Sequence, residues 1–256
     1  MSRRSILATS IVGFVMLLAA GFPAEAAEIK VLSGNGARAA VRELGAQFER
    51  ASGHKLAIHF EVNAALRRKI LAGESFDVAV LNPPVLDDLI KRGRIAADTR
   101  AVIGRIGIGV AVRAGAPKPD VSSAAAFKRA LLNAKSVAYP REGASGIYFA
   151  GLIERMGIGA EMKPKLRPMP ADDTVEVVAR GEAELVVVVA SRIVGVSGVE
   201  FAGPIPAELQ TSIGFAAGVG SAAREPEAAR AMIRFFTAPA AAPVLKAMGI
   251  EPFVEP

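Results

Sequence analysis

The chain has 256 residues, no cysteine, no tryptophan, two histidines and a formal net charge of +6. The lack of cysteine excludes disulfide bonds, cysteine nucleophiles and cysteine metal sites, and the two isolated histidines, His54 and His59, do not predict a metal site. Aromatic side chains for base stacking make up only 5% of the residues, so the modest positive charge does not predict a nucleic-acid partner.

The first 26 residues have the pattern of an export signal. Arg3 and Arg4 precede an uncharged apolar run, 6–20, and Ala24-Glu25-Ala26 offers a small-x-small cleavage site. We therefore expect residues 1–26 to be removed on export to the periplasm. The alternative is an uncleaved membrane anchor, but the run is shorter than the roughly 20 residues that a spanning helix needs.

The remaining chain alternates short β-rich runs with helical patterns, which predicts parallel sheets with crossover helices. The expected strands cover 28–33, 55–61, 76–81, 101–113, 136–139, a short run near 166, 185–189 and 211–219. The expected helices cover 37–51, 64–72, a short stretch up to 90, 123–133, 146–156, 173–179, 226–236 and 242–248.

These elements predict two α/β lobes with the chain crossing twice between them. The first lobe would contain 27–105 and 212–256, and the second would contain 106–211. The C-terminal helices would return to the first lobe. A single continuous, doubly wound sheet is the alternative interpretation.

Four turns lie where predicted strands give way to predicted helices: 33–36, 61–64, 140–146 and 171–174. In open α/β sheets, ligands bind beyond the carboxyl ends of the strands, and the unpaired N–H groups and dipole of a helix start attract anions. Each turn alone also fits an ordinary helix cap, so the prediction depends on the whole set. The expected ligand-binding residues are Ser33, Asn35, Gly36, Asn63, Ala64, Ala144, Ser145, Gly146 and Asp173.

The sequence contains no recognisable pair of a nucleophile and a base. Asp172 and Asp173 could act as acid–base carboxylates or bind a metal, but helix capping explains them better. We therefore expect a binding protein without a cofactor or a metal, and not an enzyme.

Several segments resemble the bacterial extracellular solute-binding proteins of the periplasmic molybdate-binding type. The most specific are Ala72-Gly73-Glu74-Ser75-Phe76-Asp77-Val78 and Ala144-Ser145-Gly146-Ile147-Tyr148, supported by 29–32, 152–157 and 239–249. The resemblance implies a type 2 periplasmic-binding fold, with two lobes joined by a two-segment hinge that close around one oxyanion. It also implies a monomer that passes a small anion to the membrane permease of an ABC transporter.

The sequence departs from this family at the ligand positions. The family's first hydroxyl falls near Gly36, its serine-rich second turn becomes Val62-Asn63-Ala64, and its tyrosine falls near Val189. We expect the Asn35 and Asn63 amides to replace the hydroxyls, which suits an organic carboxylate or another substituted anion better than bare molybdate. The alternatives are a ligand-sensing or envelope-associated binding protein on the same fold, or a periplasmic enzyme.

Overall fold

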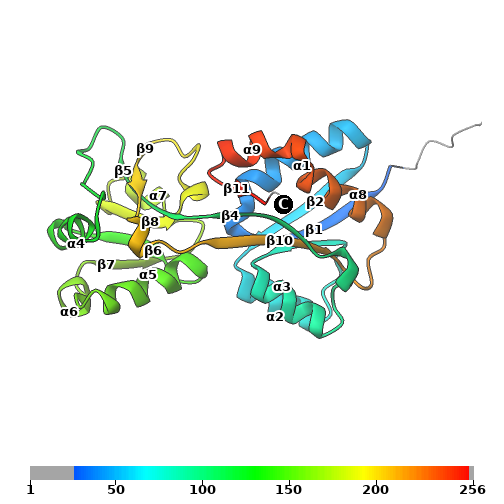
Figure 1. The fold of residues 1–256 in the computed structure, drawn as a ribbon, viewed down its shortest axis with the longest axis horizontal. Helices are drawn as coiled ribbons and strands as arrows, with labels where there is room; N and C mark the ends of the chain where they lie inside the picture. Colours follow the sequence, from blue (N-terminus) through cyan, green and yellow to red (C-terminus); the bar gives the residue numbers. More distant parts are fainter. Residues whose placement is uncertain (1–25, 254–256) are drawn as a thin grey trace, which may run out of the picture.

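The computed structural model describes residues 26–253, so the predicted export signal lies outside the described residues except for its last position. The chain forms two α/β halves that lie side by side, one around a six-stranded sheet and one around a five-stranded sheet (Figure 1). We call these halves the first and the second lobe. The single continuous sheet considered from the sequence does not form.

The first lobe has the strand order β11-β4-β10-β3-β1-β2. Strand β1 is parallel to β2 and β3, but β10 is antiparallel to β3 and β4, and β11 is antiparallel to β4. The predicted parallel pairing therefore holds for β1, β2 and β3, while β4, β10 and β11 depart from the prediction. The strands are β1 (Glu28–Gly34), β2 (Lys55–Glu61), β3 (Val78–Leu81), β4 (Ala101–Ile106), β10 (Ile213–Val219) and β11 (Glu251–Pro252).

Helices cover both faces of this sheet. On one face lie α1 (Arg38–Ser52), α8 (Pro226–Thr237) and α9 (Ala242–Ala247), and on the other lie α2 (Asn63–Leu71) and α3 (Pro83–Lys91) (Figure 1). The face under α2 and α3 has its own apolar cluster, which includes Leu32, Leu66 and Leu86. Short 3-10 turns η1 (Asn35–Ala37), η2 (Ala97–Thr99) and η5 (Pro239–Ala241) join these elements.

The second lobe has the strand order β7-β6-β8-β5-β9. All five residues of β8 are buried, as its uninterrupted apolar run predicts for a strand covered on both faces. The strands are β5 (Ile108–Arg113), β6 (Val137–Pro140), β7 (Leu166–Met169), β8 (Leu185–Val189) and β9 (Val199–Pro204). The helical elements are α4 (Ala124–Asn133), α5 (Ala144–Arg155), α6 (Gly159–Met162), α7 (Glu176–Ala179), η3 (Ala190–Arg192) and η4 (Ala207–Leu209).

The chain passes between the lobes between β4 and β5, and again between η4 and β10 (Figure 1). The predicted single strand 101–113 is thus two strands in two sheets, separated by Gly107. Gln210 links the two crossings: its Oε1 accepts from the N–H of Ile108 at 2.7 Å, and its Nε2 donates to the carbonyl of Ile108 at 2.9 Å. We propose that these crossings, next to the predicted boundaries at 105/106 and 211/212, are the hinge.

Candidate functional site

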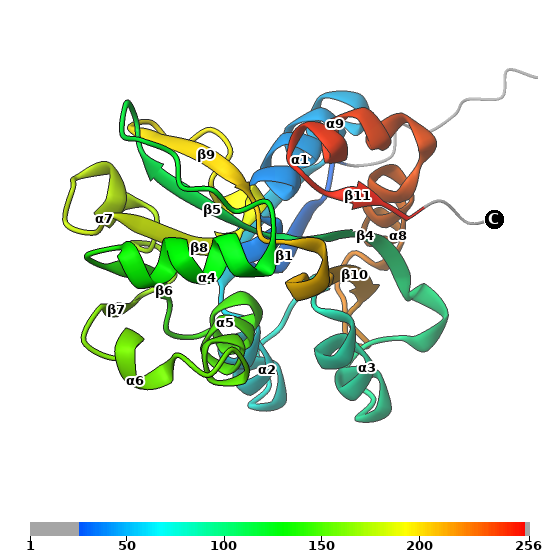
Figure 2. The ribbon, with the colours of Figure 1, turned by 60° about the vertical axis from the view of Figure 1, so that its left-hand side comes forward.

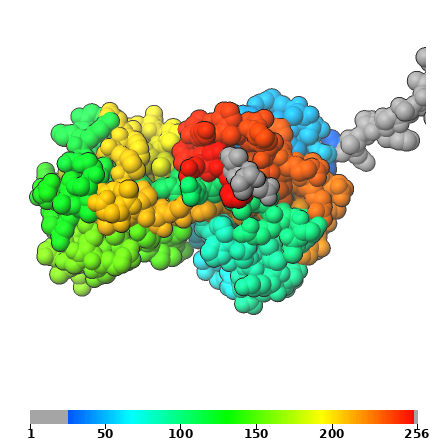
Figure 3. Space-filling model, viewed as in Figure 1, coloured from blue at the N-terminus to red at the C-terminus, as the bar shows by residue number. Residues whose placement is uncertain are grey.

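A cavity of about 480 Å³, part of it open to solvent, lies between the two lobes. The space-filling view shows a notch between the lobes along the lower edge (Figure 3). The lining residues are Asn35, Gly36, Val62, Asn63, Asn82, Pro140, Glu142, Gly143, Ala144, Ser145, Ala171, Val188, Val189, Arg192, Ile213 and Phe215.

The cavity lies where strands end and helices begin. In the first lobe, η1 follows β1, α2 follows β2 and α3 follows β3, and in the second lobe α5 follows β6. Helices α2, α3 and α5 lie on the same side of the two sheets (Figure 2). Because the first N–H groups of a helix have no partner within it, the starts of α2 and α5 supply donors and positive potential to this space. Helix α3 begins with Pro83 and Pro84, which have no N–H to offer.

Five of the nine predicted ligand-binding residues line this cavity: Asn35, Gly36, Asn63, Ala144 and Ser145. The other four, Ser33, Ala64, Gly146 and Asp173, are not among its lining residues. Ser33 is fully buried and its hydroxyl donates to the carbonyl of Gly34, while Ala64 is exposed. Asp173 pairs with Arg180 at 2.9 Å.

Gly146 has a packing role. A Cβ at this position would lie 1.7 Å from the carbonyl oxygen of Pro140, so only glycine lets α5 approach the end of β6 this closely. Helix α5 begins at Ala144, two residues before the predicted start. The close approach therefore places the N–H groups of Ala144 and Ser145 beside the cavity.

We expect Gly146→Ala to destabilise the protein by about 3 kcal/mol, because the methyl group overlaps backbone that cannot move freely. For a chain of this size, the loss lowers Tm by about 6–12 °C in calorimetry. Gly151→Ala in the same helix is the control, since its Cβ would meet only the end of the flexible Arg155 side chain at 3.2 Å. Equal Tm values for the two variants would contradict the packing role.

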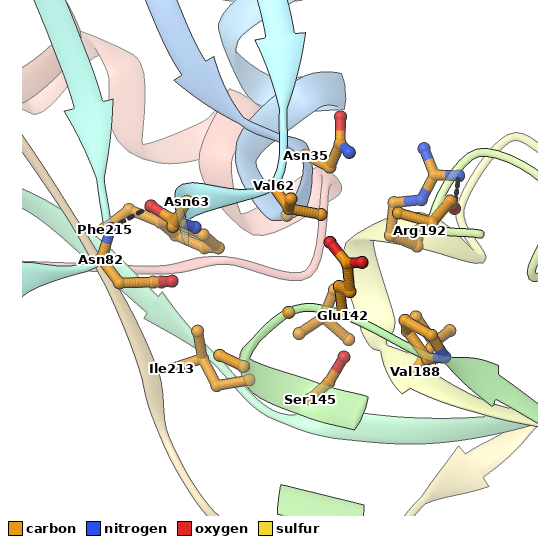
Figure 4. Close-up of a pocket in the computed structure, with 16 residues that line it drawn as sticks. Asn35, Val62, Asn63, Asn82, Glu142, Ser145, Val188, Arg192, Ile213 and Phe215 are labelled. Atoms are coloured by element: carbon orange, nitrogen blue, oxygen red, sulfur yellow. Dashed lines mark hydrogen bonds between the residues drawn. The ribbon is translucent and has the colours of Figure 1, made fainter. Parts of the chain in front are cut away.

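Two charged residues of the cavity were not predicted from the sequence. Glu142 is the one acidic side chain among the lining residues, and Arg192 is the one cationic side chain. In the close-up, the Glu142 carboxylate points into the cavity above the hydroxyl of Ser145 (Figure 4). Among residues 26–253, Glu142 has no hydrogen-bond or ion-pair partner, so its carboxylate is available to a ligand.

Arg192 ends η3, the turn that follows the buried strand β8. Its side chain is 12% exposed, and its Nη2 donates to the carbonyl of Ala171 at 2.8 Å. The same Nη2 atom also lies 4.0 Å from the carboxylate of Glu176. The other N–H donors of the guanidinium remain for an anion in the cavity. Apolar side chains form another part of the wall: Val62, Val188, Val189, Ile213 and Phe215.

Polar contacts join the lobes beside the cavity. The Nη2 atom of Arg38 in the first lobe donates to the carboxylate of Asp172 in the second at 2.6 Å. The Ser191 hydroxyl donates to the carbonyl of Gly36, also at 2.6 Å. Burial lowers the pKa of the Arg38 guanidinium. The nearby Asp172 carboxylate opposes this shift, and the positive charge of Arg192 adds to it. The structure therefore has the lobes in direct contact.

No group of three or more His, Asp or Glu side chains within residues 26–253 has an arrangement that could hold a metal ion. In the same part of the chain, no helix combines the length and the apolar character needed to cross a membrane.

The sequence model of the bacterial extracellular solute-binding proteins matches residues 29–251. The chain belongs to this family. Membership implies a location outside the cytoplasm, in the periplasm or secreted, and the binding of a solute. The family resemblance predicted from the sequence is therefore confirmed.

This solute-binding protein is similar in fold to periplasmic anion receptors. It matches the periplasmic molybdate-binding protein of Azotobacter vinelandii with a TM-score of 0.72 and 17% identity, over 89% of this chain and 99% of that one. It matches the sulfate-binding protein SubI of Mycobacterium tuberculosis with a TM-score of 0.70 and 17% identity, over 90% and 88% of the chains. The fold is the type 2 periplasmic-binding fold, as predicted.

A curated relative from a Pseudomonas species carries the name aconitate isomerase. It is 35% identical over 246 residues, which cover 92% of this chain and 94% of the relative. This relative contradicts the prediction that the protein is not an enzyme. That prediction depended on the missing nucleophile–base pair, a feature that an isomerase does not require.

Proposed function

We propose that this protein is a periplasmic isomerase that moves a proton within an unsaturated tricarboxylate of the aconitate type. The observation that carries the proposal is the free carboxylate of Glu142 in a cavity otherwise lined by hydrogen-bonding amides, a guanidinium and apolar side chains. The 35% identical relative named aconitate isomerase supports the choice of substrate class.

The donors around the cavity suit a ligand with several carboxylates. The Arg192 guanidinium can bind one carboxylate with two parallel hydrogen bonds. The start of α5 at Ala144 and Ser145 offers backbone N–H groups to a second, and the amides of Asn35 and Asn63 offer donors from the first lobe. The apolar wall around Phe215 then faces the carbon skeleton.

The chemistry requires one base and a stabilised carbanion. Aconitate carries a methylene group next to its double bond, and Glu142 would remove one methylene proton. The electron pair of the broken C–H bond forms a new double bond to the central carbon. The electrons of the old double bond move to its outer carbon and form a C–H bond there with the proton that Glu142 returns. Charge that develops on the carboxylates is stabilised by Arg192 and the N–H groups of α5. The net reaction needs no oxidant and no group transfer.

A different route to cis–trans isomerisation adds a nucleophile to the double bond, rotates the resulting single bond and eliminates the nucleophile. Cysteine is the side chain best suited to this addition because its thiolate is intrinsically very nucleophilic. The sequence contains no cysteine. The proton-transfer route is therefore the one that fits these residues.

The direct test is incubation of the mature chain, residues 27–256, with trans-aconitate and separately with cis-aconitate. The two incubations are monitored by proton NMR. We expect them to reach the same mixture of cis- and trans-aconitate, because a single base can transfer the proton in either direction. Absence of interconversion from both sides, with the protein folded and the ligands in excess, would overturn the proposed activity.

Delivery of the bound carboxylate to an ABC-transporter permease is a second candidate role, favoured by the family and by the likeness to molybdate- and sulfate-binding proteins. The two roles separate in cells that lack this protein. If delivery occurs, uptake of a labelled tricarboxylate falls in these cells, and a variant that binds but does not isomerise restores it.

A further inference from the structure

Three asparagines line the cavity, and the partners of each fix the direction of its amide. Asn35 Oδ1 accepts from the guanidinium of Arg38 at 2.7 Å, and Asn63 Oδ1 accepts from the backbone N–H of Asn82 at 2.9 Å. Because a guanidinium and a backbone N–H can only donate, both amides must present their NH₂ groups elsewhere. Both residues line the cavity.

Asn82 has the opposite orientation. Its Nδ2 donates to the backbone carbonyl of Gly214 at 2.9 Å, and a carbonyl can only accept. The Oδ1 atom of Asn82 is therefore the end that points into the cavity (Figure 4). The first lobe thus offers two donors, from Asn35 and Asn63, and one acceptor, from Asn82.

The acceptor does not match a carboxylate, because ionised carboxylates only accept hydrogen bonds. A ligand composed only of carboxylates and hydrocarbon leaves the carbonyl of Asn82 without a donor from the ligand. A hydroxyl group on the carbon skeleton can donate to it. An acceptor left unpaired when a ligand displaces its water weakens binding.

We propose that Asn82 selects a hydroxyl group, so that the cavity binds a hydroxytricarboxylate more tightly than the same tricarboxylate without the hydroxyl. This inference deepens the proposed function and depends on it for the tricarboxylate class. A saturated hydroxytricarboxylate has no double bond to shift, so it occupies the site without reacting. Hydrated counterparts of the substrate are then competitive inhibitors of the isomerase.

The test compares citrate with tricarballylate, which has the same carbon skeleton and carboxylates but lacks the hydroxyl. Isothermal titration of the mature chain should give a Kd for citrate about tenfold lower than that for tricarballylate. In Asn82→Ala, the two Kd values should come within about twofold of each other. Citrate should also inhibit isomerisation competitively, raising KM for aconitate without changing kcat.

Asn35→Ala is the matched control, because it removes a donor of the first lobe whose amide oxygen bonds to Arg38 and not to Asn82. It should weaken both ligands by similar factors and keep the preference for citrate. Equal affinities in the unmodified protein, or an undiminished preference in Asn82→Ala, would overturn the role of Asn82 even if aconitate is isomerised. If aconitate is bound but not isomerised while the preference for citrate depends on Asn82, the hydroxyl selection stands and the proposed reaction fails.

Discussion

Glu142→Gln is expected to lower kcat for aconitate isomerisation by about 10³-fold, while the Kd for tricarballylate changes by less than about threefold. General-base catalysis by one side chain contributes about 10²–10⁴-fold, and Glu142 is the one acidic group that lines the cavity. Glutamine has nearly the same size and shape as glutamate, but its amide cannot take up the proton. The measurements are initial rates by proton NMR and titration calorimetry with the non-reacting analogue.

Glu161→Gln provides the control for this substitution. Glu161 is an exposed glutamate of the short helix α6, at the outer end of the second lobe and outside the cavity (Figure 1). It should leave both kcat and Kd within about twofold of the unmodified protein. If Glu142→Gln keeps full kcat, Glu142 is not the base, and the assignment of the proton transfer to this side chain is wrong.

The overall fold could be predicted from the sequence because its signals are local. The apolar run of β8 and the 3.6-residue spacing of Val41, Leu44 and Phe48 in α1 indicate their elements directly. The strand directions could not be predicted, because no local sequence pattern indicates that β10 pairs antiparallel with β3. Strand β9 was also missed, since Val199–Pro204 contains a glycine and a proline and is only half buried.

The candidate site was predictable in its helix-start turns but not in its charged side chains. Turns with glycine, serine or asparagine at helix starts are visible in the sequence, and Asn35, Asn63, Ala144 and Ser145 do line the cavity. Glu142 lies in one of these turns, but no neighbouring residue forms a recognisable catalytic motif with it. From the sequence alone it therefore has the pattern of an ordinary loop residue. Arg192 follows β8 by a single 3-10 turn, and only the three-dimensional path of η3 brings its guanidinium to the cavity.

The same cleft geometry serves binding and catalysis with few changes. Helix starts that hold an anion by backbone N–H groups are also suited to stabilise charge that develops on a carboxylate during proton transfer. What a catalytic cleft needs in addition is a base beside the bound anion. Under the proposed function, Glu142, which directly precedes the N-cap Gly143 of α5, supplies this base.

Arg192→Gln is expected to raise the Kd for tricarballylate and for citrate by about 100-fold. Hydrogen bonds to charged groups contribute about 1.5–3 kcal/mol, and Arg192 is the one cationic side chain that lines the cavity. Glutamine is too short to keep the hydrogen bond to the carbonyl of Ala171, which costs about 1 kcal/mol, so Tm should fall by only about 2–4 °C. The measurements are titration calorimetry with both ligands and thermal unfolding.

Two further variants separate the charge of Arg192 from its shape. Arg192→Lys keeps the charge as a single point and should lose about tenfold in affinity, because an ammonium cannot form the two parallel bonds of a guanidinium. Arg180→Gln removes a guanidinium that pairs with Asp173 and Glu182 on the surface of the second lobe, and it should leave both Kd values unchanged. An Arg192→Gln variant that binds as tightly as Arg180→Gln would show that the carboxylates are held by the helix starts and amides alone.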